Sequence, residues 1–218
     1  MKKSLFLILG IVLLTGLCTG CGNNASVVTN VDKLDSKIDY FVFRNKKIYL
    51  TNSFVDYVLQ YKGMGCKLNT EGTGIAGNIN IDDINSSDHE FYNLSTERGS
   101  IIVGVECYED DEYFPASFSV GFEYDLEETL LKNKKVDYWN ISPKGENVKV
   151  YFDGTELSFG GDGKESTKED VKKMLGSGYE ENTYYDNDID ITIDNIHYAF
   201  SFSEKEDSLL LVAINDYR

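Results

Sequence analysis

The sequence predicts an α+β fold of two tandem units, each a β-hairpin and a short helical element followed by an antiparallel sheet. The first observation is that a hairpin pattern, a short helix and a glycine occur twice in this order, with Phe152 standing 109 residues after Phe43. The second is that runs typical of strands follow each helix, and segregated helices and antiparallel strands define this class. Residue identity between the two segments is slight, so chance similarity is the alternative.

The N-terminus has the features of an export signal. Lys2 and Lys3 precede an uncharged run, 5–17, which is shorter than the ~20 apolar residues needed to cross a bilayer. A positive start, a short apolar run and small residues before a cleavage point are typical of a secretory signal. The small Gly20 stands directly before Cys21.

This arrangement resembles the lipoprotein box of bacteria, in which a diacylglycerol is attached to a cysteine thiol before cleavage. The resemblance implies that 1–20 is a lipoprotein signal peptide and that Cys21 carries the lipid. Cys18 fits the box less well, because the bulky Leu17 precedes it. An ordinary signal peptide with incidental cysteines is the alternative. The expected location is the outer face of the cell membrane, with the protein anchored by its lipid.

The composition is that of a folded, acidic protein. Hydrophobic residues make up 41% of the chain, and fifteen Tyr and twelve Phe favour packed cores over disorder. The formal net charge of −16 disfavours nucleic acid as a partner, because phosphates attract Lys and Arg. It favours a basic partner at short range, or it keeps an exported protein soluble.

The first unit is predicted over 38–146, after a polar tether over 21–37 that lacks apolar periodicity. Its hairpin is expected in "YFVFRNKKIYL", where two apolar runs flank a polar turn at 44–47. A helix is expected from Ser53, the start of an S-x-x-D signal, to Gly63. Further strands are expected around Ile79 and Ile81 and over 100–109 and 116–125.

The second unit is predicted over 147–218. Its hairpin "VKVYFDGTELSF" has the favoured two-residue turn Asp153-Gly154. A helix is expected after the capping box Ser166-x-x-Glu169, with its apolar stripe in Val171, Met174 and Leu175. Strands joined as an antiparallel meander are expected over 189–193, 196–202 and 209–214.

The second unit has a family resemblance. A helical segment ending in "MLG" and followed by "IDITIDNIHYAFSFSEKEDSLLLVAI" resembles units of the β-lactamase inhibitory protein-like superfamily, which includes small envelope lipoproteins of outer-membrane assembly. "YFDGTELSF" and "CGNN" resemble exported lipoproteins of Gram-positive bacteria. The resemblance implies short helical elements paired with curved antiparallel sheets, often in tandem. It also implies non-catalytic protein binding as the commonest role, and it transfers no functional residue.

Two cysteines remain after Cys21. Cys107 falls on the apolar phase of Val103 and Val105, and Cys66 follows the first helix, so both are expected inside the first unit. An exported protein can join them as a disulfide, which would contribute roughly 4 kcal/mol in the chain-entropy model. Two buried free thiols are the alternative.

We predict no catalytic residue, cofactor or metal. The sequence has neither G-x-S-x-G nor a P-loop, and His89 and His197 do not cluster with cysteines at ligand spacing. The acidic segment 186–190 resembles the start of a calcium loop, but Ile191 stands where that loop needs Gly. The acidic run 109–112 is expected to be a solvated hairpin tip, or else to attract a cation or a basic partner.

The expected function is that of a lipid-anchored extracytoplasmic module that binds another envelope or secreted protein without catalysis. Its aromatic anchors are predicted at Tyr113, Phe114, Tyr184 and Tyr185, on the rim of a concave sheet, although these side chains could instead pack in the cores. The alternative is an enzyme or small-ligand receptor acting on cell-wall or carbohydrate material. A deep pocket with converging carboxylates would favour that alternative, and a shallow curved sheet would favour protein binding.

Overall fold

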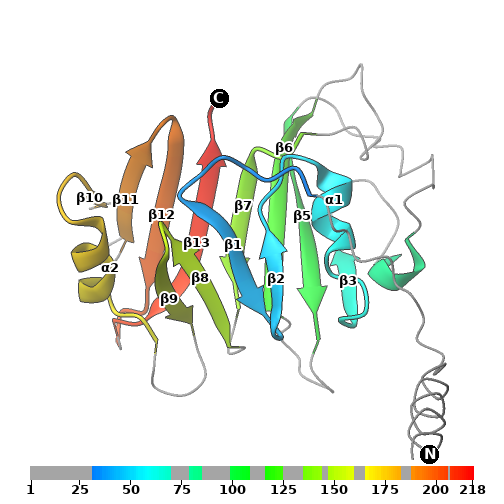
Figure 1. Cartoon of the computed structure of the whole chain (residues 1–218), viewed down its shortest axis with the longest axis horizontal. Coiled ribbons are helices and arrows are strands. Elements are labelled where there is room, and N and C mark those ends of the chain that lie inside the picture. Colours follow the sequence, from blue (N-terminus) through cyan, green and yellow to red (C-terminus); the bar gives the residue numbers. More distant parts are fainter. Residues whose placement is uncertain are drawn as a thin grey trace, which may run out of the picture.

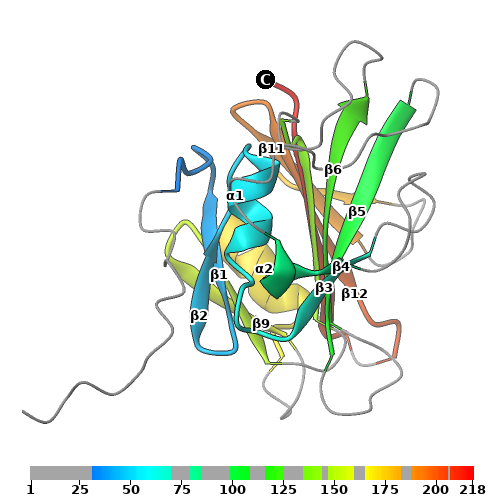
Figure 2. The ribbon, with the colours of Figure 1, turned by 90° about the vertical axis from the view of Figure 1, so that its right-hand side faces the viewer.

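The computed structural model of the chain describes residues 31–69, 79–84, 99–108, 116–124, 135–143, 147–159, 165–182, 188–205 and 207–218. This part of the protein is mostly antiparallel β-sheet, in one sheet of nine strands and one of four, with few helices. The four-stranded sheet and both α-helices lie on the same side of the nine-stranded sheet (Figures 1 and 2). In Figure 1 the two helices stand at either side of the four-stranded sheet.

The nine-stranded sheet has the order β10-β11-β12-β13-β7-β6-β5-β3-β4, and every neighbouring pair is antiparallel. The strands predicted from the sequence in both halves are confirmed, and Ile81 begins a 3-10 turn, Ile81–Asp83, instead of a strand. The strands are β3 Cys66–Asn69, β4 Ile79–Asn80, β5 Gly99–Cys107, β6 Ala116–Tyr124, β7 Tyr138–Ser142, β10 Glu180–Asn182, β11 Asp188–Ile193, β12 Ile196–Phe202 and β13 Leu209–Asp216.

Both predicted hairpins form, and together they make the four-stranded sheet. Its order is β2-β1-β8-β9, with β1 Ile38–Phe43, β2 Lys46–Tyr49, β8 Val148–Phe152 and β9 Thr155–Phe159. The first turn is narrower than 44–47, because only Arg44 and Asn45 leave the ladder, with φ of 46° and 61°. Asp153 and Gly154 have the same positive φ, at 46° and 80°, as a two-residue type I′ turn requires.

The helices α1, Phe54–Leu59, and α2, Lys168–Leu175, each begin at a side-chain cap. The Ser53 hydroxyl accepts the Asp56 N–H at 3.2 Å, as the S-x-x-D signal predicts. The capping box of α2 is formed by Thr167 and Asp170, one residue later than the predicted Ser166 and Glu169. Ser166 is not available as the cap, because it is bonded to Ser158 of β9.

The free edges of the four-stranded sheet are partly occupied by polar groups. On β2 the Gln60 carboxamide accepts the Tyr49 N–H at 2.7 Å and donates to the Tyr49 carbonyl at 3.0 Å. On β9 the Ser166 hydroxyl accepts the Ser158 N–H at 3.0 Å, and the Ser166 N–H donates to the Ser158 carbonyl at 2.8 Å. Unpaired edge groups invite pairing with another chain, and at these two positions they already have partners.

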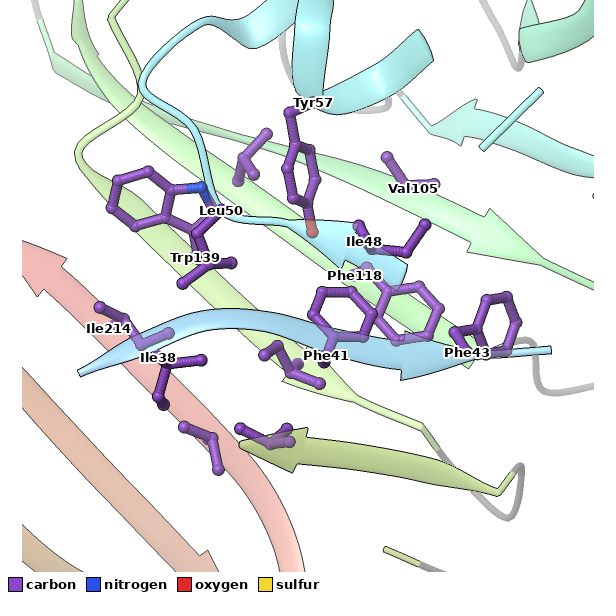
Figure 3. Close-up of a cluster of buried hydrophobic side chains, with 14 of the residues drawn as sticks. Ile38, Phe41, Phe43, Ile48, Leu50, Tyr57, Val105, Phe118, Trp139 and Ile214 are labelled. Carbon is purple, nitrogen blue, oxygen red and sulfur yellow. The ribbon is translucent and has the colours of Figure 1, made fainter. Parts of the chain in front are cut away.

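One hydrophobic core fills the space between the two sheets (Figure 3). Phe118 of the large sheet lies at its centre, with its ring centroid 5.1 Å from that of Phe41, 4.7 Å from Phe43 and 5.6 Å from Tyr61. Residues of both predicted units belong to the same cluster. Of the stripe predicted for the second helix, Val171 is fully buried and Met174 and Leu175 are partly buried.

Of the predicted tether 21–37, the structure describes residues 31–37. Within that stretch Leu34 is 2% exposed, and its N–H donates to the Leu50 carbonyl at 2.9 Å. The packed part of the protein therefore extends back to Leu34. Cys21 and the predicted signal peptide lie outside the described residues. None of the described helices is long and apolar enough to cross a membrane.

Candidate functional site

Most of the side chains that the sequence puts forward for binding lie outside the described residues. These are Cys21, His89, the acidic run 109–112 and the predicted aromatic anchors Tyr113, Phe114, Tyr184 and Tyr185. The described residues present other surfaces, and the candidate site is built from those.

Cys66 and Cys107 are register partners on β3 and β5, and their sulfurs are bonded to each other at 1.97 Å. Both residues are buried, at 1% and 0% exposed. The bond therefore links the neighbouring strands β3 and β5 of the large sheet from within the core and offers no accessible thiol chemistry.

The outer face of the nine-stranded sheet has no described helix or strand over it (Figure 2). Because side chains alternate along a strand, every second residue of this sheet points away from the core. Ala199, Ala213, Asn140 and Ser119 are successive register partners across β12, β13, β7 and β6. They form one row of this face, at the middle of the sheet.

The middle of this face carries no formal charge over four adjacent strands. We name it the central outer face and define it by twelve outward positions, at which about three or four charged residues would be usual for a surface. Ala213 is 9% exposed at its centre, beside small neighbours. The twelve are Ser117, Ser119 and Gly121 of β6, Tyr138, Asn140 and Ser142 of β7, His197, Ala199 and Ser201 of β12, and Leu211, Ala213 and Asn215 of β13.

Charged side chains stand on the strands at either side of the central outer face. On β11, Asp190 Oδ1 lies 3.7 Å from His197 Nε2. Burial raises the pKa of Asp188, the Ser201 hydroxyl opposes this rise, and the nearby Asp190 adds to it. On β5, Glu106 accepts hydrogen bonds from Asn69 Nδ2 and Tyr108 Oη, both at 2.7 Å. With Lys67 of β3 as the basic exception, this rim is acidic.

A pocket of about 670 Å³ adjoins the central outer face where β13 ends. Ile102 and Tyr217 line it, and they are 57% and 69% exposed, among the most exposed large hydrophobic side chains of the described residues. The Tyr217 ring lies 6.4 Å from the His197 ring. The rest of its lining is Gly121, Phe122, Lys135, Asp137, Tyr138, Asn215, Asp216 and Arg218.

The carboxylate of Asp216 in this pocket is committed to an ion pair. Arg218 Nε donates to its Oδ1 at 2.8 Å and Nη2 donates to its Oδ2 at 3.1 Å. These bonds hold the pKa of Asp216 below its usual range. A general acid for hydrolysis needs a raised pKa, so Asp216 is unsuited to that role. Among the described residues no cluster of three or more His, Cys, Asp or Glu could hold a metal ion.

One glycine pattern of the sequence has the spacing of a nucleotide-binding motif. Gly72, Gly74 and Gly77 have the G-x-G-x-x-G spacing of dinucleotide-binding loops, and they lie outside the described residues. That fingerprint needs a parallel βαβ unit. Here the strand before it, β3, is antiparallel to both β4 and β5, and β4 follows the glycines directly. The spacing therefore carries no evidence for a dinucleotide.

Reasoning from the sequence missed the central outer face, although a signal for it exists. In "ASFSVG" and "IHYAFS" the alternate positions that face away from the core hold small or uncharged residues, where Lys, Glu or Thr would be usual. The signal becomes specific only when β12, β13, β7 and β6 are known to be neighbours. The comparisons give no further guide: no family model, no curated protein and no solved structure matches the chain.

Proposed function

We propose that this chain is a lipid-anchored extracytoplasmic module that binds another envelope or secreted protein through its central outer face. The observation that carries the proposal is the absence of formal charge from twelve outward positions on four adjacent strands, in a chain of net charge −16. The centres of protein interfaces are depleted in charged residues, and their rims are polar. Because the rim is acidic, the partner's matching surface is expected to have basic side chains at its edge and an uncharged centre.

The size of the surface supports an interface that extends beyond its centre. Four strands at ~4.8 Å spacing and three outward rows give roughly 400 Å² for the central outer face. A standard interface buries about 800 Å² on each partner. The adjoining pocket, with the exposed Ile102 and Tyr217, and the acidic rim would supply the remaining contact area.

The anchor is proposed at Cys21, after cleavage of 1–20. With Leu34 packed against the fold, about thirteen residues remain between the lipid and the folded part, which span roughly 20 Å on average. The module would therefore stay close to the membrane. Metabolic labelling with a fatty-acid analogue tests this part: Cys21→Ala is expected to remove the label, and equal labelling of the variant would exclude the lipid anchor.

We also propose that 38–146 and 147–218 are tandem copies of one structural unit. Phe41 of β1 pairs with Val150 of β8, at the same offset of 109 that relates the two hairpin sequences. The residue before each helix cap accepts a bond from the chain entering the last strand of its half: Val136 N–H to the Asn52 carbonyl at 2.7 Å, and Leu209 N–H to the Ser166 carbonyl at 2.8 Å. Both sheets join the halves through equivalent strands, β1 with β8 and β7 with β13.

The binding proposal is tested by site-specific photo-crosslinking on intact cells. A crosslinking amino acid at Leu211, within the central outer face, is expected to give a discrete protein adduct, whereas one at Lys205, in an exposed turn, is expected to give none. Adding Ala213→Arg should abolish the adduct, because a guanidinium would stand at the centre of the interface. Thr155→Arg, at an exposed position of the other sheet, is the matched control. An adduct that persists in Ala213→Arg would exclude this surface.

A further inference from the structure

The outer face of the four-stranded sheet carries three tyrosines side by side. Tyr49 of β2 and Tyr40 of β1 are register partners, and their ring centroids are 5.7 Å apart. The Tyr151 ring of β8 lies 5.1 Å from that of Tyr40. We name Tyr49, Tyr40 and Tyr151 the tyrosine row. All three are partly exposed and point away from the core, so packing between the sheets does not require them.

Two lysine ammonium groups are held over this row. Lys33 Nζ lies 4.2 Å from the Tyr49 ring centroid, and Lys47 Nζ lies 4.1 Å from the Tyr40 ring centroid. Both lysines are exposed. An ammonium over a ring face is attracted by the negative face of the aromatic system. These contacts position two cations over the rings while leaving them accessible to an anion.

The third ring is held by hydrogen bonding. Tyr151 Oη donates to Glu156 Oε2 at 2.9 Å, and Lys149 Nζ donates to Glu156 Oε1 at 2.7 Å. These two bonds, the lysine one first, hold the pKa of Glu156 below its usual range. Glu156 therefore stays ionised near neutral pH and can accept a further hydrogen bond from a hydroxyl group.

We propose that the tyrosine row binds a glycan chain bearing acidic groups. A sugar ring can stack its C–H face on the Tyr151 ring, because Lys33 and Lys47 already lie over the rings of Tyr49 and Tyr40. Sugar hydroxyls can bond to Glu156, and a carboxylate or phosphate pairs with the ammonium groups of Lys33 and Lys47. Lys33, Lys47 and Lys149 thus stand on or beside this face together with Glu156 and the exposed Asp39, in an otherwise acidic chain. The inference is independent of the lipid anchor and of the central outer face.

The test uses residues 22–218, which contain every described element, and measures affinity for three soluble polymers. Polygalacturonate has sugar rings and carboxylates, its methyl ester has rings without charge, and poly-L-glutamate has charge without rings. Polygalacturonate is expected to bind tightest. Equal binding of poly-L-glutamate would overturn the proposal, because charge alone would then suffice.

Single substitutions test whether the glycan binds at the tyrosine row. Tyr151→Ala is expected to weaken polygalacturonate binding about tenfold, the equivalent of one stacking contact of ~1.4 kcal/mol, and Lys47→Gln about threefold, in line with a solvent-exposed charge pair. Tyr217→Ala and Lys205→Gln remove exposed side chains elsewhere and should leave the affinity unchanged. Tyr151→Phe, which keeps the ring, should retain most of the binding and guards against misfolding of the alanine variant.

Three other outcomes would also reject the proposal. The first is the absence of polygalacturonate binding by the unmodified chain, and the second is equal weakening by Tyr217→Ala. The third is binding to vesicles of anionic lipid that Tyr151→Ala abolishes, without glycan binding, which would assign the face to the membrane surface.

Discussion

The two helices that follow the two hairpins are stabilised by different interactions. Helix α1 has six residues and buries four of them, Phe54, Tyr57, Val58 and Leu59. Helix α2 has eight residues and buries only Val171 fully. The same order of elements thus places one helix in the core and the other at the surface.

Helix α2, with its shallow burial, also makes polar contacts at the surface. Both hydrogen bonds of its capping box are present, and Lys168 and Lys172 reach Glu181 of β10 at 3.6 and 2.8 Å. Tyr61, in the turn after α1, donates its hydroxyl to the buried Tyr57 hydroxyl of α1 at 2.9 Å, and burial raises the pKa of both phenols. The comparison teaches that the order of elements determines the position of each helix in this fold. How deeply each helix is buried depends on its own residues.

The largest expected effect separates the two helices directly. Phe54→Ala in α1 should lower the free energy of unfolding by about 3–5 kcal/mol, the cost of a large cavity in a fully buried site. Val171→Ala in α2 removes two methyl groups and should cost about 2 kcal/mol. Urea denaturation followed by circular dichroism measures both. Both side chains are fully buried, so equal losses in the two variants would contradict the larger cavity expected at Phe54.

A smaller effect is expected where the two halves meet, at the end of β13. The Asp216 N–H donates to the Asp137 carbonyl of the first half at 2.7 Å, and the Asp216 carboxylate is paired with Arg218. Asp216→Asn should cost about 1.5–3 kcal/mol at pH 7, as for other hydrogen bonds to a charged group.

The pH dependence of this difference follows from the lowered pKa of Asp216. The folded state favours the carboxylate more than the unfolded chain does, so the stabilisation is fully present above the unfolded pKa of about 3.9. It is lost as the pH falls through the folded pKa. Denaturation curves of the wild type and Asp216→Asn should therefore converge in acid. A difference that is constant with pH would show that the charge is not responsible.

The smallest effect concerns the N-caps, which α1 and α2 have in common although they differ in burial. Thr167→Ala should cost about 1 kcal/mol, a typical value for a lost N-cap, and Ser53→Ala should cost about the same, because the cap bond of α1 is also 3.2 Å long. Thr167→Ser, which keeps the hydroxyl, is the control. Hydrogen exchange should locate the change at α2, whereas a loss confined to α1 would contradict this account.

The hairpins and meander strands could be predicted because short-range patterns define them. "FDGT" sets a two-residue turn, and the alternation in "IDITI" sets a strand whatever lies beyond it. The cap of α2 was placed one residue early because "STKED" contains two overlapping start signals. The bond between Ser166 and Ser158 decides between them, and that contact depends on the position of β9.

The pairings between the halves could not be predicted in the same way. β1 meets β8, and β7 meets β13, across long stretches of chain, and no local pattern in either partner specifies the other. The tyrosine row and the central outer face exist only because of these pairings. Leu34 shows the same limit within the polar stretch 31–37, where a lone leucine gives no periodicity and is nevertheless buried.

The polar groups on the edges of the four-stranded sheet have a consequence for how recognition can evolve here. With Gln60 bonded to the backbone of Tyr49 and Ser166 bonded to that of Ser158, a partner cannot extend the sheet there by adding a strand of its own. Backbone pairing accepts many sequences, because every peptide carries the same donors and acceptors. Contacts that depend on side chains are selective, so single substitutions on the outer faces would alter binding of the proposed partner while the hydrogen bonds of the scaffold stay unchanged.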